Sequence, residues 1–197
     1  MTTTLHEEIK KMETNEIIPQ IVKSVPCKKL IVKYGIREMD LGDVITPTAA
    51  KDKPTLVDYV YEKDQFYTLI LIDADDPSRT NRLNAEVKHW ILVNIKENNV
   101  NKGEHLVQYL GPTPPVGTFL HRYIFILCKQ PSKLDFKGEY KIPFTLENRK
   151  NWSSDEFIKK WDLIIEGINY FECQYDDQAQ FINEKLIESQ EESIKIK

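Results

Sequence analysis

Side chains that can bind a charged group stand at the ends of three apolar stretches of the sequence. Two aspartates follow one stretch and two histidines precede two others, namely Asp73, Asp75, His89 and His121. Imidazole nitrogens donate hydrogen bonds to phosphate oxygens, and carboxylates accept hydrogen bonds from an ammonium group. These residue types therefore predict a site for a phosphate-bearing or zwitterionic group, such as phosphoethanolamine.

Three predicted strands would position these side chains. Residues 66–72, 88–95 and 124–128 are apolar runs of the length of buried strands. If they are antiparallel neighbours, the end of the first strand and the beginnings of the other two lie at one rim of a sheet. We therefore expect the two aspartates and two histidines to meet at that rim.

A stiff loop precedes the second histidine. Three prolines and two glycines lie within residues 111–117, and the loop leads into His121. Such a loop predicts a preformed site, with backbone amides that can donate to an anion.

The motifs at this rim resemble those of a known family. They are D-x-D-x-P-S-R from Asp73 to Arg79, a histidine at the head of a strand that ends in V-N-I, and P-P-x-G-x-x-x-H-R-Y from Pro114 to Tyr123. Together they are similar to the signature of the phosphatidylethanolamine-binding proteins, the family of the Raf kinase inhibitor protein. The resemblance extends over roughly residues 15–187.

The resemblance implies a mainly β fold, an antiparallel two-sheet β-sandwich with peripheral helices. It also implies a ligand-binding pocket made of residues that match the family position by position, with Asp75 beside them, the Thr113 amide as a donor and two prolines as walls. The predicted pocket residues are Asp73, Asp75, His89, Thr113, Pro114, Pro115, His121 and Tyr123.

The chain departs from the family pattern at several pocket positions. Ala74 replaces a proline, which leaves Asp76–Pro77 as the candidate cis bond of the turn. The other departures are Thr113 and Phe119 for glycines, Val87 for an aromatic residue and Gln178 for a tyrosine that closes the pocket in relatives. These changes affect which headgroup the pocket selects.

Composition narrows the class of protein. The net charge of −4 and pI near 5.7 disfavour nucleic acid as a partner. Three widely spaced cysteines argue against a disulfide framework. The first residues are polar and acidic, unlike a signal peptide, and no apolar run approaches the ~18 residues of a membrane span. We expect a cytoplasmic monomer without a transmembrane segment.

One domain is expected over residues 1–187. It includes an N-terminal helical segment at 1–14, and a capping box at Ser153 to Glu156 predicts a further helix. Residues 130–152 have no hydrophobic period and are expected to form a loop. The charged residues 188–197 are expected to form a frayed tail.

Other interpretations of the same residues remain open. Aspartates after a strand also serve as turn formers, and a single histidine is more often structural. Aspartate and histidine can also bind zinc or act in metal-dependent hydrolysis. We find no H-E-x-x-H or G-x-S-x-G motif and expect a binding protein that needs no cofactor, rather than an enzyme. The resemblance to the family implies two candidate protein partners, a protein kinase and a serine protease.

Overall fold

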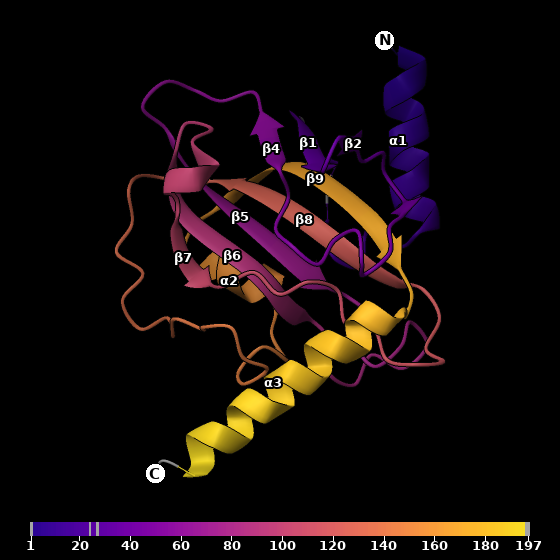
Figure 1. Cartoon of the computed structure of the whole chain (residues 1–197). Coiled ribbons are helices and arrows are strands. Elements are labelled where there is room, and N and C mark those ends of the chain that lie inside the picture. Colours follow the sequence, from indigo (N-terminus) through magenta and orange to yellow (C-terminus); the bar gives the residue numbers. More distant parts are fainter. Residues whose placement is uncertain (1, 24, 27, 196–197) are drawn as a thin grey trace.

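The computed structural model describes residues 2–23, 25–26 and 28–195. Its strands are β1 (Lys28–Tyr34), β2 (Arg37–Glu38), β3 (Asp43–Val44), β4 (Leu56–Tyr59), β5 (Phe66–Asp73), β6 (Val87–Lys96), β7 (Glu104–Val107), β8 (His121–Lys129) and β9 (Ile164–Cys173). Its helices are α1 (Thr2–Thr14), the 3-10 helix η1 (Val100–Lys102), α2 (Ser154–Lys160) and α3 (Asp177–Lys195), as Figure 1 shows.

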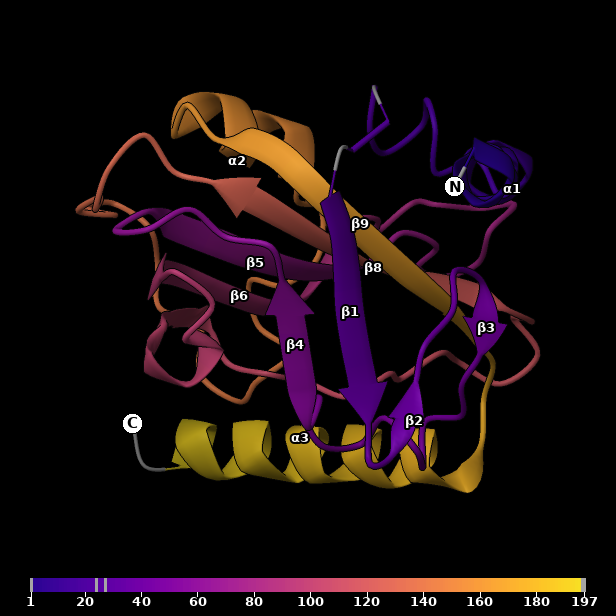
Figure 2. The same cartoon turned by 90° about the horizontal axis from the view of Figure 1, so that it is seen from above.

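The strands form a mixed sheet in the order β2-β1-β9-β8-β5-β6-β7. Within the run β9-β8-β5-β6-β7, each strand is antiparallel to the next. β9 also pairs in parallel with β1 and β3, and β4 pairs with β1 in antiparallel orientation. Figure 2 shows β4, β1 and β2 passing across one face of the strands β5, β6, β8 and β9.

Two apolar clusters lie on opposite faces of the central strands, because successive side chains of a strand point to opposite faces. Ile124 and Ile126 of β8 belong to a cluster with α1 and α2, whereas Tyr123 and Phe125 belong to a cluster with β1 and β4. The central sheet is therefore buried on both faces, which explains why its strands read as nearly continuous apolar runs.

The predicted antiparallel two-sheet sandwich needs correction. The sheet is mixed, because β1 and β3 both run parallel to β9. Two separate sheets are not confirmed, since β1 pairs with β9 and also with β2 and β4. The mainly β class with few helices is confirmed.

The helices agree with the sequence signals in part. Ser153 caps α2 by accepting from the Glu156 amide, as the capping box predicts. The predicted tail, by contrast, is helical as far as Lys195, and residues 196–197 lie outside the described part. The helix α3 packs Ile182 and Leu186 against Leu110 of the proline loop.

Candidate functional site

The predicted rim is present. Asp73 at the end of β5 pairs with Val87 near the start of β6 and with Tyr123 near the start of β8. His121 in turn pairs with Cys173 at the end of β9. Antiparallel pairing thus gathers the predicted side chains at one end of the sheet, as expected from the strand order.

His121 is held on both sides of its ring. Its Nδ1 lies 2.9 Å from Asp73 Oδ2, and its Nε2 lies 2.8 Å from Thr118 Oγ1. The Thr118 hydroxyl donates to the Pro115 carbonyl oxygen at 2.7 Å. A hydroxyl has a single hydrogen, so Thr118 Oγ1 must accept from His121 Nε2. Both ring nitrogens then act as donors, which makes His121 a charged imidazolium.

The electrostatics of His121 agree with this assignment. Burial lowers the pKa of His121, but the hydrogen bond and charge of Asp73, with the charges of Asp75 and Asp76, outweigh it and raise that pKa above its ordinary value. The imidazolium and the Asp73 carboxylate therefore form a buried ion pair.

His89 differs from His121 in charge. Its Nδ1 donates to the Leu110 carbonyl oxygen at 2.9 Å, because a carbonyl oxygen accepts only. Burial lowers the pKa of His89 to about 4, so the ring is neutral at pH 7. Its Nε2 then carries a lone pair, and this atom has no hydrogen-bond partner within the described part of the chain.

Tyr123 links His89 to the proline loop. Its ring packs edge-on against His89 at 5.0 Å and stacks on Phe171 at 5.2 Å between centroids. Its hydroxyl accepts from the Thr113 amide at 3.3 Å. Burial and the nearby Asp73 raise the pKa of Tyr123 well above its ordinary value, so the phenol keeps its proton.

Asp75 forms an ion pair with Arg122 rather than with the two histidines. Both its oxygens accept from the guanidinium of Arg122, at 2.6 and 2.8 Å, and the Arg122 amide adds a third bond at 2.9 Å. Neither side chain is exposed. Arg79 also forms salt bridges, with Glu172 and Glu16.

The proline loop presents two different surfaces. Pro114 is buried and Pro115 is exposed, while Val116 and Phe119 are 72% and 81% exposed. Phe119 has φ of 61°, a left-handed conformation that glycine adopts more easily, at a position where the family pattern leads us to expect glycine. Next to Thr118, the loop borders an open cavity of about 550 Å³.

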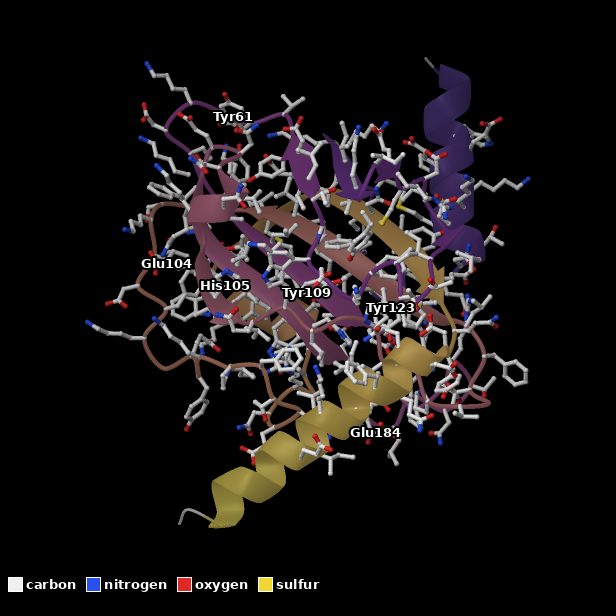
Figure 3. All side chains as sticks on the ribbon, in the orientation of Figure 1. Tyr61, Glu104, His105, Tyr109, Tyr123 and Glu184 are labelled. Atoms are coloured by element: carbon white, nitrogen blue, oxygen red, sulfur yellow. The ribbon has the colours of Figure 1, made fainter. Side chains whose placement is uncertain are left out.

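The structure also shows where the other residues that depart from the family pattern lie. The Asp76–Pro77 peptide bond, the candidate cis bond of the turn, is cis. Val87 and Ala74 are buried beside the rim. Gln178 lies in the first turn of α3, where its backbone amide donates to Asp176 Oδ1. Figure 3 shows Tyr123 toward the beginning of α3, with His105 farther away on the β7 side.

Sequence reasoning missed Arg149, which fixes the backbone around His89. This buried guanidinium donates to five carbonyl oxygens, those of Lys88, His89, Gln108, Pro143 and Thr145. The segment has no hydrophobic period, so the sequence offered no signal for this role. Thr118 was also missed, although its position three residues before His121 in the loop indicates that the two side chains can meet.

Within the described residues we find no group of three histidine, cysteine or acidic side chains arranged to hold a metal ion. In the same part of the chain, no helix has the length and apolar character needed to cross a bilayer. Cys128 and Cys173 are buried free thiols, and Cys27 lies outside the described residues.

Comparison with known proteins decides the family. Residues 36–163 match the family described as phosphatidylethanolamine-binding protein. The chain belongs to the phosphatidylethanolamine-binding protein family. The resemblance seen in the sequence motifs is thereby confirmed.

Several known proteins are similar to this chain over most of its length. The chain is 30% identical to the putative odorant-binding protein A5 of Drosophila melanogaster over 169 residues, 84% of this chain and 80% of that protein. The phosphatidylethanolamine-binding protein from Plasmodium vivax superposes with a TM-score of 0.73 at 24% identity, over 85% of this chain and 97% of that one. A carboxypeptidase Y inhibitor, solved in complex with its cognate proteinase, gives a TM-score of 0.75 at 24% identity, over 87% and 96%.

Proposed function

We propose that this member of the phosphatidylethanolamine-binding protein family binds a phosphate-bearing group at the rim formed by Asp73, His89, His121 and Tyr123. The observation that carries the proposal is the unpartnered Nε2 of His89, in a ring that packs against the protonated phenol of Tyr123 at the same rim as the Asp73–His121 ion pair. Packing alone does not require these groups to converge.

The charges already present at the rim determine whether an anion needs an additional hydrogen-bond donor. His121 and Arg122 are cationic, but each is already paired with an aspartate. An entering anion therefore needs a further donor, and His89 supplies it by taking up a proton at Nε2. A ligand with its own P–OH group, such as inorganic phosphate, can instead donate that hydrogen to the Nε2 lone pair.

The geometry supports recognition of the phosphate rather than of the ammonium group. Asp73 accepts from the Asp75 amide and from His121, and Asp75 is bound by Arg122. Both carboxylates are buried and already paired with a cation, which disfavours contact with an ammonium. We therefore leave Asp75 out of the proposed ligand contacts and keep Asp73, His89, Thr113, Pro114, Pro115, His121 and Tyr123.

We propose that the pocket serves regulation of signalling proteins, with protease inhibition as the second candidate. One feature favours the second. Val116 and Phe119 project from a loop stiffened by prolines, and an exposed apolar loop of this kind suits insertion into a partner's cleft. A relative of the same fold is an inhibitor of carboxypeptidase Y.

An amide NMR titration with inorganic phosphate and with glycerophosphoethanolamine tests the binding proposal. We expect saturable shifts at residues 73–75, 89 and 111–123. The variant His89→Gln should weaken binding of the phosphodiester at least about tenfold, since one charge-assisted hydrogen bond is lost. His105→Gln is the matched control, because His105 lies outside the site and bonds the Trp90 indole instead.

Two results of this titration would contradict the proposal. Equal losses in both histidine variants would show that the shifts do not report on this site. Absence of saturable shifts with either ligand would contradict the pocket, and inhibition assays with serine proteases on Phe119→Ala would then test the second candidate.

A further inference from the structure

A small cavity lies on the opposite side of β9 from the candidate site, beneath α1. Its volume is about 90 Å³, and its walls come from α1, β1, β9 and the segment between β2 and β3. Figure 1 shows α1 beside the part of the sheet made by β1, β2 and β9. The apolar walls include Met12, Leu30, Met39, Leu41 and Ile168.

The cavity results from the way two strands share one edge of β9. β1 pairs with β9 at Gly167 and Ile168 and then leaves it, and β3 begins to pair at Phe171. Between these points no described strand pairs with this edge of β9, and the side chain of Asn169 forms hydrogen bonds there instead. Its Nδ2 donates to the carbonyl oxygens of Leu30 at 2.9 Å and Met39 at 3.4 Å.

The other end of that amide is unsatisfied. Asn169 is 4% exposed, and its Oδ1 has no hydrogen-bond partner within the described part of the chain. The two bonds of Nδ2 fix the orientation of the amide, because carbonyl oxygens accept only from the NH₂ group. A buried acceptor without a donor is destabilising, and native proteins leave few of them.

The walls suit a ligand that supplies this donor. Two of the three methionines of the chain, Met12 and Met39, line the cavity. Methionine side chains are unbranched and flexible, and they adapt to ligands of different shape. The Oδ1 atom is covered in the present arrangement, so a side chain of the wall must move before a hydroxyl can reach it.

We infer that this cavity is a second binding site, for a small neutral molecule with an apolar body and one O–H or N–H donor, such as a short alcohol. An anion is disfavoured, because the unsatisfied atom is an acceptor and the two lysines of the lining, Lys28 and Lys29, are paired with Glu166 and Glu38. A cavity of about 150 Å³ holds a six-membered ring. At about 90 Å³, this cavity encloses only part of a molecule of that size, and the rest extends through its opening to solvent.

Two isomers test the inference because they differ only in the donor. Cyclopentanol has a hydroxyl group, whereas tetrahydropyran has the same atoms and only an acceptor. In protein labelled with ¹³C at the methionine methyl groups, cyclopentanol should shift Met12 and Met39 saturably. It should bind about tenfold more tightly than tetrahydropyran, because only the alcohol satisfies Asn169 Oδ1.

A cavity-filling variant completes the test without touching Asn169. Leu41→Trp should abolish the cyclopentanol shifts, whereas Leu83→Trp, at a position 75% exposed, should leave them unchanged. Equal binding of the two isomers would overturn the proposed donor recognition. If neither isomer binds, the site is overturned and water is the occupant. Cyclopentanol binding that persists in Leu41→Trp would also overturn the site. Phosphate should compete with neither isomer.

Discussion

Arg122→Met should lower the free energy of unfolding by about 3 kcal/mol, because the buried Asp75 carboxylate loses its bidentate partner and keeps only Arg82, whose Nε lies 3.7 Å from Asp75 Oδ1. The guanidinium also donates to the Asn15 carbonyl oxygen and to Gln20, both at 2.7 Å. The variant therefore also loosens the segment after α1 from the rim. Urea unfolding followed by circular dichroism measures the change.

Two further variants isolate the buried ion pair. Arg79→Met removes an arginine that pairs at 3.3 and 3.4 Å with carboxylates near the surface, and it should cost about 1 kcal/mol or less. Adding Asp75→Asn to Arg122→Met should recover at least about 1 kcal/mol relative to the sum of the single changes, because the uncompensated charge is gone. Equal costs for Arg122→Met and Arg79→Met would show that the buried pair has no special weight.

Affinity for a phosphodiester should fall about 30-fold as the pH rises from 5 to 6.5. The empty site holds His89 neutral with a pKa of about 4, and the complex requires its protonated form, so each pH unit above that value costs about a factor of ten. His121 stays charged through this window, because Asp73 raises its pKa above the ordinary value near 6.5. Calorimetric titration with glycerophosphoethanolamine measures the slope.

Inorganic phosphate and a variant provide the controls for this slope. Inorganic phosphate brings its own P–OH donor and should lose affinity less steeply over the same range. In His89→Gln the slope for the phosphodiester should vanish. An affinity that is constant between pH 5 and 6.5 would mean that His89 stays neutral in the complex.

Strand order made the rim predictable. Asp73 ends one apolar run while His89 and His121 begin two others, and antiparallel pairing brings that end and those beginnings together. The ion pair of Asp75 with Arg122 was partly predictable too. Side chains alternate along a strand, so Arg122 must face away from its neighbours His121 and Tyr123.

The parts that were not predictable depend on contacts between distant segments. The parallel pairing of β1 and β3 with β9 joins residues more than a hundred positions apart, and no local pattern encodes it. Arg149 and the Leu110 carbonyl oxygen set the position of His89, but one lies in an aperiodic segment and the other is a backbone atom. The neutral state of His89 follows from burial, which the sequence alone does not give.

The protonation of His89 tests the central claim most directly. Long-range ¹H–¹⁵N NMR of the imidazole rings at pH 6.5 reports both nitrogens of each histidine, with and without glycerophosphoethanolamine. Without ligand we expect His89 to be neutral with hydrogen on Nδ1, and His121 to be doubly protonated. With ligand we expect His89 to gain a proton at Nε2. A His89 ring that remains neutral while the phosphodiester saturates the protein would contradict the account.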